Sequence, residues 1–191
     1  MIVKLLLLLL TALTVEGATI TAITPQSSYS SGDFVRIDVS VSNVTDLYAF
    51  QFDLSFNPAV LIAQSVTETG YFLSNGVSFF PGLIDNNTGS VSFIGDSLSG
   101  SGPGFSGSTI LATAIFKALT GTTIVSPSNA VLLDSNLSDI AANTNSATVS
   151  ITSESATPEP VTSGLLVVGL AILAAFGNQK SKIIPTQDQT D

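Results

Sequence analysis

The chain has 191 residues, of which 45% are hydrophobic and only 10% are charged, and its formal net charge is −9. Arg36 and Lys117 are the only basic residues between positions 18 and 152. The chain therefore lacks the basic patch that nucleic acids and anionic lipid surfaces require. The absence of Cys and His excludes disulfides, thiol nucleophiles, imidazole general bases and the commonest zinc ligand.

The N-terminus has the three parts of a secretory signal peptide. Lys4 provides the positive charge, the leucines at 5–10 begin an apolar segment, and Gly17 and Ala18 are the small residues at its end. A buried helix is the alternative, but a run of six leucines offers no polar face to solvent. We therefore predict that residues 1–17 are removed during export.

Residues 18–152 have the alternation that is typical of β-strands. Apolar and polar residues alternate from Val35 to Val41 and again from Tyr48 to Phe56. The segment from Thr109 to Leu119 contains good helix formers, but its β-branched residues and flanking glycines favour a strand. Short strands at regular spacing, without amphipathic helices between them, predict an all-β sandwich or jelly roll.

Segments rich in Gly, Asn, Asp and Pro mark the expected turns. The segment 43–46 is expected to separate two strands, and 85–89 to form a hairpin turn that is followed by Val91 and Phe93 on one face of a strand. The glycine-rich segment 95–108 is expected to be a long loop.

Four segments together resemble a cohesin domain. They are "VSNVTDLYAFQFDLSFNPAVL" at 41–61, "NTGSVSFIG" at 87–95, "GSTILATAIFKAL" at 107–119 and "SATVSIT" at 146–152. The resemblance covers about residues 20–152. It implies a cohesin-like jelly-roll β-sandwich of about nine strands. It also implies a function in protein–protein binding of the dockerin type, and the related carbohydrate-binding modules make polysaccharide binding the alternative.

The resemblance also points to candidate binding residues. Many dockerin-binding cohesins have an acidic residue just before the proline of "FNPAVL", and here that residue is Asn57, whose amide forms hydrogen bonds without a charge. Tyr71, Phe72 and Phe105 lie in or near turns and are the aromatic candidates for contact with a ligand. The expected partner is a surface protein or a polysaccharide, and no cofactor is expected.

The sequence predicts no catalytic residue and no metal site. Glu68, Asp53, Asp85 and Asp96 are the carboxylates that a glycosidase could use, but Asp53 is expected on the exposed face of a strand, which is an ordinary place for it. No His is present to activate a serine. Asp85 begins a segment that partly resembles a calcium loop, but the closing Glu is missing, so a hairpin turn explains it better. We therefore expect a protein that is not an enzyme.

A second apolar segment lies near the C-terminus, at 161–177. It contains no charged residue and would extend about 25 Å as a helix, which is just long enough to span a bilayer. Lys180 and Lys182 follow it, so the positive-inside rule places residues 178–191 in the cytoplasm and the domain outside. A buried core helix is the alternative, although this small domain offers little to surround it.

Pro158, Glu159 and Pro160 stand in the linker 153–160, immediately before the apolar segment. The order of Pro-Glu-Pro, apolar run and basic cluster resembles the bacterial PEP-CTERM sorting signal, which a membrane protease of the exosortase type recognises. Here lysines replace the arginines that are usual in that family, and nine further residues follow them. The expectation is an exported envelope protein with one membrane-spanning segment, which processing could release or attach to the surface. A plain membrane anchor is the alternative.

Overall fold

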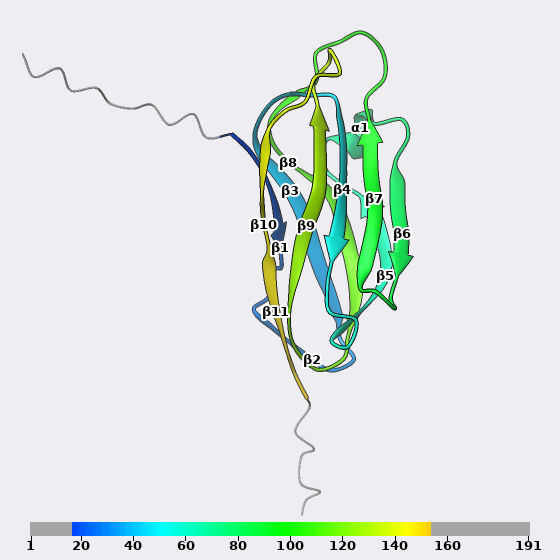
Figure 1. Cartoon of the computed structure of the whole chain (residues 1–191), viewed down its shortest axis with the longest axis vertical. Helices are drawn as coiled ribbons and strands as arrows, with labels where there is room; N and C mark the ends of the chain where they lie inside the picture. The colour runs from blue at the N-terminus through cyan, green and yellow to red at the C-terminus, as the bar shows by residue number, and fades with distance from the viewer. Residues whose placement is uncertain (1–16, 154–191) are drawn as a thin grey trace, which may run out of the picture. The chain divides into compact units, whose positions relative to one another are not determined.

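Two β-sheets pack face to face over residues 17–153, the part of the chain that this computed structural model describes (Figure 1). The predicted signal peptide, sorting motif, membrane segment and cytoplasmic tail lie outside the described residues. Within residues 17–153, no helix is long and apolar enough to cross a membrane. The predicted all-β sandwich is thereby confirmed, whereas the terminal segments stay predictions.

One sheet has five strands and the other has six, so the described residues form eleven strands and not the nine or so that were expected. The strand order of the first is β10-β1-β3-β8-β5, and that of the second is β2-β11-β9-β4-β7-β6. The strands of the five-stranded sheet are β1 (Ala18–Ile23), β3 (Phe34–Leu47), β5 (Leu61–Glu68), β8 (Phe105–Ala118) and β10 (Ala142–Asn145). Those of the six-stranded sheet are β2 (Ser28–Ser30), β4 (Ala49–Ser55), β6 (Phe80–Asp85), β7 (Ser90–Ser97), β9 (Gly121–Leu133) and β11 (Ala147–Thr152).

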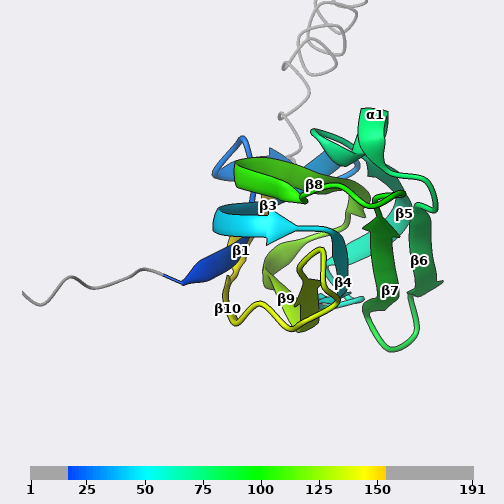
Figure 2. The ribbon, with the colours of Figure 1, turned by 90° about the horizontal axis from the view of Figure 1, so that it is seen from above.

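Most neighbouring strands run antiparallel. The exceptions are β1 with β10 and β11 with β2, which pair in parallel. Seen from above, β3 and β8 lie in one layer and β7 and β9 in the other (Figure 2). The short helix α1 (Phe72–Asn75) lies in the connection from β5 to β6.

The core lies between the two sheets and consists of the inward-facing residue of each alternating pair. In β4, Phe50, Phe52 and Leu54 are buried, as the alternation in the sequence predicts. Phe56 follows the same rule, and its ring meets that of Phe116 from the opposite sheet at 5.0 Å, edge to face. Burial of many apolar side chains supplies the stability that a domain without disulfides needs.

Of three predicted features of the strands, one is confirmed and two need correction or refinement. The segment from Thr109 to Leu119 is a strand, as predicted, and lies in β8. The segment 43–46, however, does not separate two strands but lies within β3, where Asn43 and Asp46 have φ of 54° and 60° and the pairing with β8 shifts register. Asn and Asp tolerate this left-handed conformation, so the strand bends and continues. The predicted loop at 95–108 shrinks to 98–104, because strands β7 and β8 extend into it.

Candidate functional site

The outer face of the six-stranded sheet exposes large apolar side chains. Residues opposite each other in a β-ladder share a face. In β6, Leu83 lies opposite Ser92 and Phe80 lies opposite Gly95, and both positions of β7 are on the outer face of the sheet. With Phe93 of β7, Phe80 and Leu83 form a set of exposed apolar side chains to which β9, beyond the polar outward residues of β4, contributes two more. Its members are Phe80, Leu83, Phe93, Ile124 and Val131. We call this set the apolar face.

Asp53 lies on this face and accepts hydrogen bonds from both neighbouring strands, from a backbone group of β7 and from a side chain of β9. One carboxylate oxygen accepts a hydrogen bond from the backbone N–H of Phe93 in β7 at 2.7 Å, and the other accepts one from the side-chain amide of Asn129 in β9, also at 2.7 Å. Phe93 and Asn129 have φ of 64° and 47°, and the register of β4 with each neighbour shifts at Asp53. A left-handed conformation costs free energy in a non-glycine residue, so these bonds stabilise two strained β-bulges.

The bulge in β7 turns Phe93 outward. Val91 and Ile94 are both buried, whereas the side chain of Phe93 is 54% exposed. Strict alternation would have placed Phe93 on the same face as Val91, so the expectation that both share one face is wrong. The extra residue of the bulge changes the phase of the strand.

A shallow hollow adjoins the apolar face. Its volume is about 230 Å³, and it lies where β4 and β9 run side by side. Its walls are mostly apolar. The lining residues are Ala49, Phe50, Gln51, Val131 and Leu133. A single inserted side chain of a partner fits such a hollow better than a separate small ligand does, because small-ligand pockets are usually about 300 Å³ or larger.

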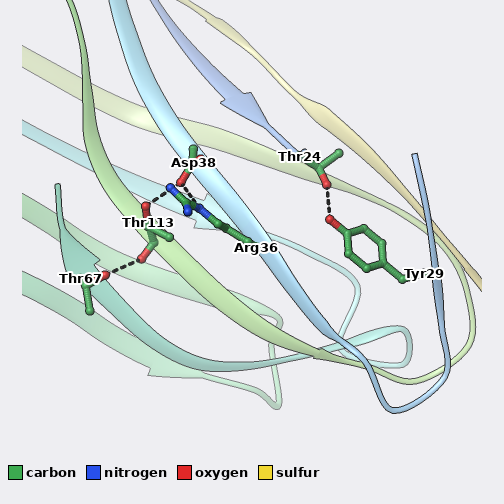
Figure 3. Close-up of polar contacts among 6 residues, drawn as sticks. All are labelled: Thr24, Tyr29, Arg36, Asp38, Thr67 and Thr113. Atoms are coloured by element: carbon green, nitrogen blue, oxygen red, sulfur yellow. Dashed lines mark hydrogen bonds and ion pairs between the residues drawn. The ribbon is translucent and has the colours of Figure 1, made fainter. Parts of the chain in front are cut away.

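The outer face of the five-stranded sheet is more polar, although Phe34 at the start of β3 is exposed on it. Asp38 of β3 accepts hydrogen bonds from Arg36 Nε at 2.8 Å and from the hydroxyl of Thr113 in β8 at 2.6 Å (Figure 3). Within residues 17–153 both basic side chains, Arg36 and Lys117, belong to this sheet. The two faces of the sandwich therefore differ in chemistry, and the apolar one carries no basic residue of the described range.

The predicted binding residues do not form one site. Asn57 follows the end of β4, and its side chain accepts a hydrogen bond from the backbone N–H of Ala59 at 3.0 Å. Phe105 pairs with Leu47, just before β4 begins, and its ring lies 4.6 Å from that of Tyr71. The seven residues of β4 thus separate the two places by about 23 Å.

The expectation that Phe72 contacts a ligand needs correction. Its side chain is 0% exposed, and its ring meets that of Phe50 edge to face at 4.9 Å. Phe72 is the apolar anchor that holds α1 against the core, so it offers no surface to a partner. Tyr71, in contrast, is only partly buried and lines a hollow of about 150 Å³ with Tyr48 and neighbouring loop residues.

Two of the four carboxylates considered for catalysis come together inside the sandwich. Asp96 of β7 is buried, and its Oδ1 accepts hydrogen bonds from the backbone N–H groups of Ser78 at 2.8 Å and Ser97 at 2.7 Å. Burial, and then the hydrogen bond and charge of Asp96, raise the pKa of Glu68 to about 7. Apart from the hydrogen bond that the two carboxyl groups share when Glu68 is protonated, Glu68 Oε1 and Asp96 Oδ2 are buried without a partner among the described residues.

The other two carboxylates have structural roles. Asp53 holds the bulges described above. Asp85 stabilises the turn between β6 and β7, because its Oδ1 accepts a hydrogen bond from the backbone N–H of Asn87 at 2.8 Å. That bond and those of Thr88 lower the pKa of Asp85. The predicted hairpin turn is confirmed at this position.

Comparison with known proteins places this sandwich in a family. The model of the cohesin domain matches residues 20–155. No curated protein sequence matches the chain. Among solved structures, a type II cohesin domain from the cellulosome of Acetivibrio cellulolyticus is similar, with 18% identity and a TM-score of 0.59 over 70% of this chain and 95% of that one.

Two further structures have the same fold. A non-cellulosomal cohesin from the hyperthermophilic archaeon Archaeoglobus fulgidus has 20% identity and a TM-score of 0.56 over 73% of this chain and 94% of its own. The sixth cohesin of scaffoldin B from Acetivibrio cellulolyticus, in complex with a dockerin, has 17% identity and a TM-score of 0.57 over 72% of this chain and 100% of its own. Since the family model spans almost all of the described sandwich, and solved cohesins share its two-sheet architecture, the chain belongs to the cohesin domain family.

Proposed function

We propose that the chain is an exported, non-catalytic cell-surface protein whose cohesin domain binds a dockerin-type protein partner through the apolar face. Cohesin domains mediate binding to dockerins, and similar cohesins have been solved in complex with dockerins. The single observation that carries the proposal for this chain is Phe93, an exposed aromatic ring held in a strained conformation by Asp53.

Phe93 has the properties of an interface hot spot. An aromatic side chain buries a large apolar area on binding and loses little conformational entropy when its backbone is already fixed. Leu83 and Phe80 lie on the same face and would exclude water around it. Exposed groups of apolar side chains are often found at protein-interaction sites.

The charge of the domain indicates which partners suit it. Residues 17–153 contain nine acidic side chains and two basic ones. A partner with an apolar centre and a basic rim would associate faster with such a surface than a neutral or acidic partner would. Asn57 forms hydrogen bonds without a charge where many dockerin-binding cohesins have an acid, so we propose that the apolar face supplies most of the affinity.

The experiment compares two exposed phenylalanines on opposite sheets. The full chain, the Phe93→Ala variant and the Phe34→Ala variant are titrated by calorimetry with a panel of purified type I and type II dockerins. Phe34 is a matched control, because it is also exposed but belongs to β3. We expect at least one dockerin to bind, Phe93→Ala to weaken binding by about 30-fold or more, and Phe34→Ala to leave it unchanged.

Two results would contradict the proposal in distinguishable ways. If no dockerin of either type binds the parent chain, the partner is wrong. If a dockerin binds but both variants retain the parental affinity, the partner is right and the apolar face is wrong. Equal losses in both variants would indicate a general defect, which circular dichroism of each variant would detect.

We also propose that the terminal segments export the domain and hold it at the cell envelope. Cohesin domains are typically extracellular or displayed at the cell surface. The N-terminal apolar segment supports export. Sorting by an exosortase-type protease is supported by Pro158-Glu159-Pro160. Insertion in a membrane is supported by the apolar segment that precedes Lys180 and Lys182.

Polysaccharide binding is the alternative function. The rings of Tyr71 and Phe105 lie against each other, so part of the aromatic surface available for stacking on a sugar is already covered. A different surface has features that favour a polysaccharide, and it belongs to the other sheet.

A further inference from the structure

Three neighbouring strands of the five-stranded sheet present uncharged polar side chains on their outer face. In β1, Thr19 and Thr21 alternate with the buried Ile20, so both hydroxyls point away from the core. The register of β1 with β3 and with β10 places polar residues directly beside them. Two rows of three side chains result, Asn143–Thr19–Ser42 and Asn145–Thr21–Ser40.

This polar array is hollowed. A groove of about 420 Å³ lies over it and is lined by five of the six side chains together with Asn43 and with Gly17, which the predicted cleavage of the signal peptide would remove. It is larger than the two hollows described above, which measure about 230 and 150 Å³. Its volume lies within the range of roughly 300–1,000 Å³ that is typical of small-ligand sites. We call it the polar groove.

The lining excludes most classes of ligand. None of its residues is charged, so an anion would find no cation and a metal ion would find no carboxylate. None of the lining side chains is apolar. A hydrophobic ligand would therefore remove water from polar groups without forming hydrogen bonds to them, which costs free energy. Hydroxyls and amides both donate and accept hydrogen bonds, as the hydroxyl groups of a neutral sugar do.

Most side chains of the groove outside Asn43 are also available. Within residues 17–153, Thr21, Ser42, Asn143 and Asn145 form no side-chain hydrogen bond, and the hydroxyl of Thr19 forms only a long one of 3.4 Å to the carbonyl of Gly17. A ligand can therefore bind Thr21, Ser42, Asn143 and Asn145 without breaking side-chain hydrogen bonds of these four residues. Neighbouring side chains within a row lie about 4.8 Å apart, from one strand to the next, and the two rows lie about 7 Å apart along the strands. A linear chain of sugar rings can therefore meet successive strands.

We propose that the polar groove binds a neutral polysaccharide. Binding rests on hydrogen bonds from β1, β3 and β10 and does not depend on stacking, since no aromatic residue lines the groove. The groove and the apolar face belong to different sheets, so a polysaccharide and a protein partner can be bound at the same time. The proposal is independent of the dockerin-type partner.

The test removes two hydroxyls without changing the shape of the strand. The full chain, a Thr19→Val/Thr21→Val variant and a Thr148→Val control are titrated with cellohexaose, maltohexaose, mannohexaose and chitohexaose, and with a galacturonic acid hexamer as the acidic comparison. Val keeps the β-branched shape that strands favour. Thr148 is an exposed strand threonine of β11 in the other sheet, so the control carries the same change outside the groove.

We expect saturable binding of at least one neutral hexasaccharide. The double variant should bind it about tenfold or more weakly, and Thr148→Val should bind it like the parent. In amide NMR spectra, addition of the bound sugar should shift the signals of Thr19, Thr21 and Asn143 while leaving that of Phe93 in place. This readout locates the site even if the double variant folds poorly.

Several outcomes would overturn the proposal. They are binding of none of the neutral sugars, binding of only the acidic hexamer, and equal binding by the parent and a folded double variant. A concentration-dependent dimer that the double variant loses, without any sugar binding, would assign the groove to a second copy of the chain instead.

Discussion

Asp53 shows how one side chain can determine the geometry of a surface. It fixes Phe93 and Asn129, two residues in left-handed conformations, on the strands to either side of it. Its partners stand 40 and 76 positions away in the sequence. No local pattern in the sequence predicts such bonds. The alternation of β7 therefore predicts the wrong face for Phe93.

We expect Asp53→Ala to destabilise the domain by about 1–3 kcal/mol. The substitution removes the carboxylate that accepts hydrogen bonds from the two strained residues, Phe93 and Asn129. Asp53→Asn keeps one carbonyl oxygen and should lose less. Urea denaturation measures the free energy of unfolding of both variants, and hydrogen exchange at the amide of Phe93 should accelerate most in Asp53→Ala. Unchanged exchange at that amide would show that the bond contributes nothing.

Glu68 makes the stability of the domain depend on pH. Its pKa is raised from 4.5 to about 7, so the folded state holds a proton that the unfolded state releases earlier. The stabilisation is complete below pH 4.5 and is lost as the pH rises through 7. Burial of a second carboxylate beside Asp96 is the physical cause.

Glu68→Gln should reduce this dependence, because an amide can donate a hydrogen bond to Asp96 at any pH. We expect the urea midpoint of the parent to fall between about pH 5 and about pH 8.5, and that of Glu68→Gln to fall much less. The pKa of Asp46 is lowered by the hydroxyl of Ser135 and the N–H of Gly104, so its contribution has the opposite sign and disappears in strong acid. Parallel curves for parent and variant between pH 5 and 8.5 would contradict the assignment to Glu68.

At the scale of elements, the connection between β5 and β6 is held from two sides. Phe72 anchors α1 in the core, and Asp96 accepts hydrogen bonds from Ser78 just after it. Gly76 lies between these two anchors, and a Cβ atom there would overlap Oδ2 of Asp96. The connection therefore requires a glycine at this position for reasons of space.

Gly76→Ala should destabilise the domain by about 2 kcal/mol or more, because either the connection or the buried carboxylate must move. Gly102→Ala is the matched control, since a Cβ atom at Gly102 meets no atom within 4 Å. Thermal unfolding of the two variants beside the parent compares them directly. Similar melting temperatures for Gly76→Ala and Gly102→Ala would show that the crowding at Gly76 relaxes without cost.

The sequence predicts the elements better than it predicts the surface they form. The alternation in β3 and β4 and the β-branched residues of β8 were sufficient to identify strands, because burial of one face imposes period two. The turn predicted at 43–46 is wrong, because turn-forming residues also suit a bulge inside a strand. The apolar face was missed because its members come from β6, β7 and β9 and meet only through register. The polar groove is likewise made by strands that are far apart in the sequence.

For the whole molecule, the terminal segments decide where these surfaces act. Replacing Pro158, Glu159 and Pro160 by alanines should leave an uncleaved, membrane-bound form in a host that has the matching protease. The wild-type chain in the same host should give a shorter product, and a host without the protease is the control. Immunoblots of membrane and surface fractions distinguish the two forms, and identical processing of both chains would show that the segment is a plain anchor.

The position of β11 has a mechanical consequence. This last strand of the domain is bonded on both sides, in antiparallel to β9 and in parallel to β2 (Figure 1). A force on the chain beyond Ser153 therefore enters along the axis of a strand that two ladders hold. It must shear both ladders at once, whereas an edge strand pulled in the same direction would have to shear only one. We expect a domain built in this way to keep its fold under tension from the side of its C-terminus.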